Sequence, residues 1–335
     1  MKNFYLFFLF FSFLKFGFSQ TNYVELIPNI IQDVQRFGEA YIDPATDAAM
    51  YNVNSGWYSS AETKNFLEVE LNVLSNISVI PNTGGNFILD PSTYNSIRFE
   101  DGYEPRNVAS IFGSDMDISI YIDYETDEGT ESIELELPPG IDNGNVNLLP
   151  TFFIQGNLGL PKGTELKFRY SPEIEVGDIT TEAKGLALQH EFTSWLKEDQ
   201  DFFLDIAGMI AYSNFEANYF IENEDPTSEA SIVSDLDAWS FSLIASKDLN
   251  NFTFFGGLDY STAKSISNFQ GIYTLPEEGE MFQNVLDQIE IENKTNGFSG
   301  TLGINYLFGS FVTKLAVNLQ KYSNLSIAVG YHFGK

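Results

Sequence analysis

The chain has 335 residues, of which 47 are acidic and 17 are basic, giving a formal net charge of −30. This excess of negative charge argues against binding to nucleic-acid phosphates. The sequence contains no cysteine, which excludes disulfides and cysteine-based metal sites. Phe and Tyr are plentiful, as expected for the aromatic girdles of a membrane β-barrel.

The first residues have the pattern of an export signal. Lys2 precedes an almost wholly apolar run over residues 4–14, and small residues such as Gly17 and Ser19 follow. We therefore predict that residues 1–19 are a cleaved signal peptide, whose removal leaves 15 basic and 47 acidic side chains and a net charge of −32. Lys15 at the end of the apolar run is unusual and leaves an uncleaved anchor as the alternative. Elsewhere no apolar run approaches the roughly 18 to 20 residues that a spanning helix requires.

Residues 20–63 show helical rather than alternating periodicity. Their apolar side chains recur at spacings of three and four, at Tyr23, Ile27, Ile30, Ile31, Val34 and Phe37. Pro28 suits an early helical position and Gly38 a helix end, and the stretch from Asp43-Pro44 to Tyr58 is rich in turn residues. We expect residues 20–63 to be a plug or hatch inside a barrel, or a periplasmic lid. The alternative is a helix packed against the outside of a β-sandwich.

From residue 64 onward the pattern is strand, turn, strand. Apolar residues alternate with polar ones from Leu67 to Val79 and again from Leu325 to Phe333, and residues 118–137 read as a hairpin. Further strands are predicted at residues 152–160, 166–170, 183–192, 202–212, 238–246, 252–260, 297–307 and 311–319. Long two-faced strands at both ends of the chain predict an all-β fold, with residues 64–335 forming an antiparallel transmembrane barrel of roughly 12–14 strands. A soluble sandwich is the alternative.

Acidic residues concentrate in three stretches, Glu100 to Asp142, Glu216 to Asp237 and Glu277 to Glu292. We interpret them as solvated loops, with divalent-cation bridging to anionic lipid headgroups as the alternative. Within the last stretch, Pro276 and the spacing of Phe282, Val285, Leu286 and Ile289 predict a short helix. Its apolar face could either receive an apolar ligand or pack over the barrel rim.

Four charged residues are candidates for the barrel lumen. Glu68 and Glu70 share the polar face of one predicted strand, and Lys167 and Arg169 share that of another. If the polar face lines the lumen, these side chains could steer an anionic ligand headgroup. They could equally pair with residues of the plug.

The sequence offers little support for catalysis. His190-Glu191 lacks the second histidine of a zinc protease, and a lipid hydrolase would need His190 to activate a serine such as Ser171 or Ser194. The residues Asp123, Glu125, Asp127 and Glu134 fit positions of a calcium loop, but Glu128 stands where that loop needs glycine. We therefore predict no enzyme, no metal and no cofactor, with a barrel lipid hydrolase as the weakest alternative.

Several blocks resemble a known family. The stretches 149–160 and 163–172, together with 185–192, Trp195-Leu196, 41–44 and 56–58, are similar to a functionally uncharacterised family of outer-membrane barrels common in Bacteroidetes-type bacteria. That family is more distantly similar to the long-chain fatty-acid channels of FadL type, whose lumen is filled by an N-terminal hatch. The resemblance implies location in the outer membrane of a Gram-negative bacterium, contact with its lipid, and passage of a hydrophobic small molecule. The Asn-Pro-Ala element of the fatty-acid channel hatch is absent, however, and Asn52 to Gly56 takes its place. A non-transporting scaffold or protein-secretion partner is the main alternative.

Overall fold

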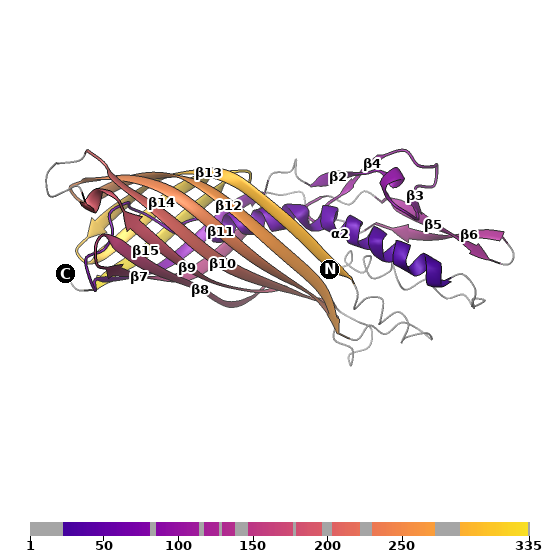
Figure 1. Cartoon of the computed structure of the whole chain (residues 1–335), viewed down its shortest axis with the longest axis horizontal. Coiled ribbons are helices and arrows are strands. Elements are labelled where there is room, and N and C mark those ends of the chain that lie inside the picture. The colour runs from indigo at the N-terminus through magenta and orange to yellow at the C-terminus, as the bar shows by residue number, and fades with distance from the viewer. Residues whose placement is uncertain are drawn as a thin grey trace.

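The computed structural model describes residues 23–80, 85–113, 117–126, 129–137, 147–176, 179–195, 203–221, 230–271 and 289–333. Ten antiparallel strands close into a barrel in the order β1-β15-β14-β13-β12-β11-β10-β9-β8-β7 (Figure 1). The barrel strands are β1 (Val69–Ile80), β7 (Asn147–Leu160), β8 (Thr164–Val176), β9 (Ile179–Glu191), β10 (Asp205–Ile221), β11 (Ala230–Leu249), β12 (Phe252–Gly271), β13 (Glu290–Phe308), β14 (Phe311–Leu319) and β15 (Asn324–Phe333). The predicted antiparallel barrel is therefore confirmed, and it closes because the first barrel strand pairs with the last.

The number of barrel strands is lower than the roughly 12–14 expected. The hairpin at residues 118–137 is present, but it lies outside the barrel in a small separate sheet. The barrel strands are also longer than predicted, and β10, β11 and β13 continue into stretches that we interpreted as acidic loops. Glu216 lies within β10, and Asp235 and Asp237 lie within β11. The predicted helix at residues 282–289 lies outside the described residues except for Ile289.

Helix α2 (Tyr23–Asn54) is longer than the sequence suggested. It continues past Gly38, the expected end, and through the Asp43-Pro44 pair that we read as a turn. Gly38 allows the helix to approach β13 closely, because a Cβ atom at this position would lie 2.5 Å from Cδ1 of Ile291. Packing on several sides supports the helix despite Gly38 and Pro44, and tertiary contacts of this kind commonly outweigh local helix propensity.

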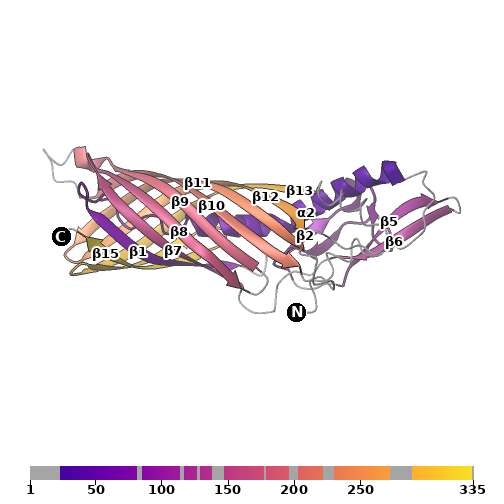
Figure 2. The same ribbon diagram turned by 90° about the horizontal axis from the view of Figure 1, so that it is seen from below.

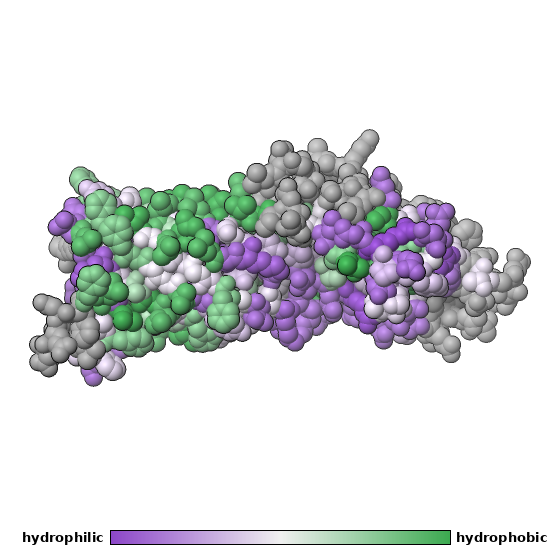
Figure 3. All heavy atoms as spheres, turned by 90° about the horizontal axis from the view of Figure 1, so that it is seen from above, coloured by the Kyte–Doolittle hydropathy of each residue, from purple (hydrophilic) through white to green (hydrophobic). Residues whose placement is uncertain are grey.

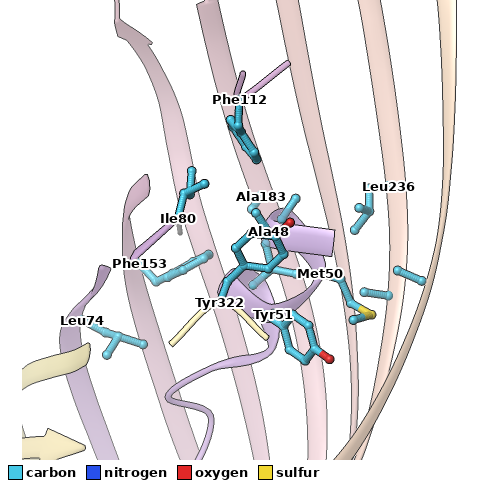
Figure 4. Close-up of a cluster of buried hydrophobic side chains, with 14 of the residues drawn as sticks. Ala48, Met50, Tyr51, Leu74, Ile80, Phe112, Phe153, Ala183, Leu236 and Tyr322 are labelled. Atoms are coloured by element: carbon cyan, nitrogen blue, oxygen red, sulfur yellow. The ribbon is translucent and has the colours of Figure 1, made fainter. Parts of the chain in front are cut away.

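The carboxyl-terminal half of α2 lies inside the barrel, and the amino-terminal half extends beyond its rim (Figures 1 and 2). Inside the barrel, Ala48, Met50 and Tyr51 pack against wall residues such as Phe153 and Leu236 (Figure 4). This apolar cluster fixes the helix against the inner wall. After Asn54 the chain continues as residues 55–66, which we call the strap, and then enters β1.

Residues 85–137 form a small unit beyond the barrel rim, which we call the head module. It contains β2 (Asn86–Leu89) paired with β4 (Arg106–Ala109), and β3 (Ile97–Arg98) paired with the hairpin of β5 (Ser119–Thr126) and β6 (Gly129–Glu136). Its buried side chains, including Leu89, Phe99 and Ile120, pack on Phe37 and Tyr41 of α2. Asp33 of α2 also accepts hydrogen bonds from the backbone amides of Asn95 and Ser96, both at 2.8 Å. The outer half of the helix is therefore anchored to the head module.

The outer face of the barrel carries a continuous apolar belt. Outward side chains such as Val73, Leu243 and Leu302 are 62%, 55% and 66% exposed. In Figure 3 hydrophobic residues cover the part of the barrel near the carboxyl terminus, whereas hydrophilic residues dominate toward the head module. The described helices include none that is long and apolar enough to cross a membrane.

Aromatic side chains mark both edges of this belt. Toward the head module lie Tyr212, Trp239, Tyr260 and Phe298, which we call the head-side girdle; Tyr212 and Trp239 have ring centroids 5.1 Å apart, and Tyr260 and Phe298 have theirs 5.0 Å apart. At the opposite edge lie Phe252, Tyr306, Phe311 and Tyr331, the turn-side girdle, with centroids 4.9 Å apart in the first pair and 5.0 Å in the second. Beyond the head-side girdle the outward face of β12 and β13 becomes charged, where Lys264 and Glu292 form an ion pair at 2.7 Å.

Candidate functional site: a lumen closed by the strap

The inward face of the barrel is lined by polar side chains because alternate strand residues point to opposite sides of the wall. Amides are prominent among the buried inward residues, which include Asn72, Asn76, Gln155, Asn157, Gln189, Asn305 and Asn318. A primary amide offers two donors and an acceptor, so it can satisfy the backbone of a chain that runs past it without regular secondary structure.

The wall amides bind the strap through its backbone. Gln189 donates hydrogen bonds to the carbonyls of Ser60 at 2.9 Å and Ala61 at 3.2 Å. Asn305 donates to the carbonyl of Ser59 at 2.5 Å. On the other side of the barrel, Gln155 donates to the carbonyl of Trp57 at 3.3 Å. The strap is thus held from several strands at once.

Arg169 makes the most extensive contact between wall and strap. Its guanidinium donates to the carbonyls of Val53 at 3.1 Å and Ser55 at 2.9 Å and to Oε1 of Gln155. The same group stacks on the ring of Trp57, at 4.0 Å from the centroid, and lies 4.7 Å from that of Phe153. Oxygen acceptors and π-faces together compensate the buried cation.

Trp57 fits because the wall beside it lacks a side chain. A Cβ atom on Gly185 of β9 would lie 2.7 Å from Cζ2 of Trp57, and the Trp57 side chain is fully buried. On the opposite wall, the Tyr58 hydroxyl donates to Asp259 at 2.9 Å. The two aromatic residues of the strap are therefore seated in different parts of the wall.

A charged cluster holds the end of the strap at the rim from which β1 starts. Glu70 of β1 lies 3.1 Å from Nζ of Lys64 and 2.8 Å from Nε2 of His332, and it also pairs with Lys314. Glu165 of β8 accepts a hydrogen bond from the backbone amide of Lys64 at 2.9 Å. Because Glu70 is 1% exposed, these interactions occur in a solvent-shielded site where an unmatched charge is costly.

The four charged lumen candidates lie together on the inner side of the wall or at its rim. Glu70, Lys167 and Arg169 are buried, and Lys167 pairs with Glu165 at 3.1 Å. Glu68 is half-buried at the rim and accepts hydrogen bonds from the backbone and side chain of Asn65. Glu70 and Arg169 bind strap residues, so their geometry fits pairing with the N-terminal segment; a role in ligand binding stays a prediction.

Sequence reasoning missed the uncharged part of this site. Gln155, Gln189, Asn305 and Gly185 occupy inward strand positions, and Trp57 is in the strap. Strand parity alone could have placed these amides inside the barrel. Nothing in the sequence, however, tells which of them meets the strap.

The space that remains around the strap is small. A cavity of about 20 Å³ lies between the strap and the wall, lined by residues that include Tyr58, Asn72, Lys314 and Ser326. Both polar atoms of the Asn72 amide are buried without a protein partner, and the volume suits about one water molecule. This cavity has no room for a lipid-like molecule.

One seam of the barrel wall is paired over only part of its length. The ladder between β7 and β8 ends at Ile154 and Tyr170, whereas β7 remains paired with β1 as far as Asn147. On the other edge of β8, the register against β9 shifts between Ser171 and Ile174, on either side of Pro172. Residues 147–153 and 171–176 therefore border a stretch of wall without ladder pairs between β7 and β8, about 20 Å long at the rise of a strand.

The family model that matches this chain is described as a family of unknown function, DUF6588, and it covers residues 1–333. The chain belongs to this family. The resemblance to a functionally uncharacterised family is thus confirmed, and the bacterial group stays a prediction. No curated protein sequence matches the chain significantly.

Solved structures similar to this DUF6588 member are distant. The translocator domain of the autotransporter NalP from Neisseria meningitidis matches with a TM-score of 0.38 and 9% identity, covering 91% of this chain and 99% of that one. An outer-membrane channel from Pseudomonas putida F1 has a TM-score of 0.33 and 8% identity, covering 84% and 99%. A FadL homologue from Pseudomonas aeruginosa has a TM-score of 0.30 and 9% identity, covering 79% and 68%.

His190 of this DUF6588 chain lies on the outer face near the turn-side rim. Its Nδ1 is 2.9 Å from Oγ1 of Thr164, and its ring packs edge-on against Phe192 and Trp195. Ser194 donates instead to the carbonyl of Glu191 at 2.7 Å. The histidine is therefore a rim residue whose hydroxyl partner is a threonine rather than either serine considered from the sequence.

The structure describes some of the acidic residues in the calcium-loop pattern. Asp123 on β5 forms a two-pronged pair with Arg98, at 2.7 and 2.9 Å, and Arg98 holds its pKa below the usual range. Among the described residues, no three His, Asp or Glu side chains gather as a metal site. Asp127 lies outside the described residues.

Proposed function

We propose that this protein is an outer-membrane β-barrel that binds or passes a hydrophobic small molecule. The apolar belt supports the membrane location. Along β11 the belt runs from Trp239 to Leu249, about 33 Å of strand, which is about 25 Å along the axis of a barrel with strands tilted by roughly 40°. That height matches the hydrophobic thickness typical of outer-membrane barrels, and the two girdles stand where the lipid headgroups would be.

The seam between β7 and β8 is the observation that carries the proposed passage. It interrupts the wall beside Phe152, which is 51% exposed on the lipid-facing side, and Phe153, which is buried on the inner side. Behind it lie Met50 and Tyr51 of α2 in the apolar cluster. A hydrophobic molecule dissolved in the membrane would thus meet unpaired strand edges and then an apolar interior, without having to cross a water-filled channel.

The proposed passage requires the strap to move, because its hydrogen bonds to β7, β9 and β13 hold it across the lumen. The strap has no helix or strand over residues 55–66. Water can replace each of its hydrogen bonds to the wall. Its displacement would clear the turn-side half of the lumen while leaving the wall ladders intact.

A disulfide across the seam tests the route. The absence of native cysteine allows Phe152→Cys with Pro172→Cys, two outward positions that would face each other if the β7–β8 ladder continued. The matched control is Gly156→Cys with Phe168→Cys, which face each other on the same two strands within the intact ladder. We expect oxidation of the seam pair to abolish uptake of a fluorescent long-chain fatty acid into proteoliposomes, and reductant to restore it. Oxidation of the control pair should leave uptake unchanged.

Two results would count against the proposal in different ways. Equal uptake with the seam bridged would reject the lateral route. No ligand-dependent uptake by any variant, including one lacking residues 20–63, would reject transport itself.

A non-transporting scaffold or protein-secretion partner is the second candidate. The number of wall side chains that bind the strap backbone favours it, because a permanently filled lumen needs no mobile closure. This candidate predicts a stable protein partner that co-purifies with the intact barrel, together with no uptake of hydrophobic probe. The weakest candidate is a lipid hydrolase that uses His190, and absence of hydrolysis by the intact protein would reject it.

A further inference from the structure

The two ends of the barrel differ in their connections. At the end that carries the carboxyl terminus, the strands are joined by residues 161–163, 192–204, 250–251 and 309–310, and all of these except 192–204 are short turns. At the other end, the connections include residues 222–229, residues 272–289 and the whole of residues 81–146 with the head module. Outer-membrane barrels place short turns in the periplasm and long connections outside the cell.

The barrel wall is asymmetric in the same direction. On β13 the head-side girdle stands at Phe298, yet the strand continues back to Glu290, and its outward side chains there include Lys294, which is 69% exposed, and Glu292. On the turn side, Phe308 and Phe311 lie next to the Gly309 turn itself. On β13, polar wall therefore extends past the apolar belt at the head end.

The amino-terminal half of α2 lies in this projecting part. Gln35 donates to the carbonyl of Glu290 at 3.2 Å, and Asn293 donates to the carbonyl of Glu39 at 2.8 Å. The other side of the helix packs on the head module through Phe37 and Tyr41. The helix is thus enclosed between β13 and the head module, and it leads from there into the lumen.

We propose that the head module and the amino-terminal half of α2 face the outside of the cell, so that the chain passes inward through its own barrel as helix and strap before β1 begins. The inference rests on the proposed membrane location but not on transport. It assigns the head module, whose residues 85–137 include 13 acidic and 2 basic ones, to the surface that extracellular partners and cations meet. It also places the mature amino-terminal side of the helix opposite the carboxyl terminus.

Single cysteines test this orientation on intact cells with a membrane-impermeant maleimide. Asn29→Cys on α2, Glu104→Cys in the head module and Asn251→Cys in the β11–β12 turn are all exposed positions, and the natural chain has no cysteine to give background labelling. We expect Asn29→Cys and Glu104→Cys to be labelled equally in intact and permeabilised cells. Asn251→Cys should be labelled only after permeabilisation.

Each other outcome is informative. Labelling of Asn251→Cys alone in intact cells would reverse the orientation and overturn the inference. Labelling of Glu104→Cys without Asn29→Cys would show that the helix does not emerge with the head module, which would also overturn it. Recovery of the protein outside the outer-membrane fraction would instead reject the proposed location. All three variants should retain heat-modifiable migration on gels as the check on folding.

Discussion

The guanidinium carbon of Arg169 lies 4.0 Å from the centroid of the Trp57 ring inside the barrel, where Arg169 is 1% exposed and Trp57 fully buried. This contact joins strand β8 to the strap. A cation is retained in the lumen because the carbonyls of Val53 at the end of α2 and of Ser55 in the strap accept the hydrogen bonds of Arg169.

Replacing Arg169 should therefore loosen the strap. Arg169→Met leaves the carbonyls of Val53 and Ser55 and Oε1 of Gln155 without their donor, and we expect the free energy of unfolding to fall by about 2 kcal/mol because each unsatisfied buried acceptor is costly. Urea unfolding in detergent micelles measures the change. Lys294→Met, at an exposed position, is the control and should have little effect. An unchanged unfolding midpoint for Arg169→Met would show that the strap does not depend on this residue.

The glycine opposite Trp57 provides a steric test. Gly185→Leu would force Trp57 or the neighbouring β10 backbone to shift, because even a Cβ would lie 2.7 Å from Trp57 and 2.8 Å from the Tyr212 carbonyl. We expect an increase in ion leakage through planar bilayers. Gly156→Leu, where a Cβ meets nothing within 4 Å, should leave leakage at the level of the unaltered protein. Equal leakage in the two variants would argue against Trp57 as part of the closure.

Glu70 is expected to matter far more than a surface carboxylate. Glu70→Gln leaves Lys64, Lys314 and His332 without their buried anionic partner, and we expect a loss of about 3 kcal/mol in stability. Glu292→Gln removes an exposed partner of Lys264, so its cost in stability should be much smaller. Refolding into detergent after urea denaturation compares them. Equal costs would mean that the cluster at Glu70 is not shielded from solvent.

The fold was largely predictable because barrel strands have a strict period of two. The segments Leu67 to Val79 and Leu325 to Phe333 predicted the first and last strands, which pair in the structure. The polar ends of β10 to β13 could not be assigned in the same way. There the outward residues become polar as well, as at Asp235 and Lys264, so the alternation that reveals a strand disappears where the wall leaves the apolar belt.

The site was predictable only in part. Parity directed Glu70, Lys167 and Arg169 to the inner side of the wall, where all three are buried, but the strap partners of Glu70 and Arg169 lie in a segment without periodicity. Gly38 shows the same limit for the helix. As a sequence signal it marks a helix end, and only its contact with Ile291, more than 250 residues away, explains why the helix continues.

The head module should show its own pH dependence. The hydrogen bond from Arg98 lowers the pKa of Asp123, so the ionised carboxylate stabilises the folded module at pH values above the usual pKa of an aspartate, and this contribution is lost as pH falls through the lowered pKa. We expect hydrogen exchange of β5 amides, corrected for intrinsic rates, to show reduced protection under acid conditions. Because the pair is partly exposed, the effect should stay below about 1 kcal/mol. Arg98→Met should remove this pH dependence of β5 protection. A pH profile that is the same in Arg98→Met and in the unaltered protein would contradict the role of the Arg98–Asp123 pair.

Locking the strap to the wall tests the central claim most directly. The hydroxyls of Ser60 in the strap and Ser246 on β11 are 3.1 Å apart, so Ser60→Cys with Ser246→Cys offers a disulfide that ties the strap in its closed position. Ser234→Cys with Ser267→Cys joins β11 and β12 at a similar hydroxyl distance of 2.7 Å and serves as the control. The measurement is fatty-acid uptake into proteoliposomes before and after oxidation. We predict that oxidation stops uptake for the strap pair, reversibly, and leaves it unchanged for the control pair; uptake that continues with the strap locked would contradict closure by the strap.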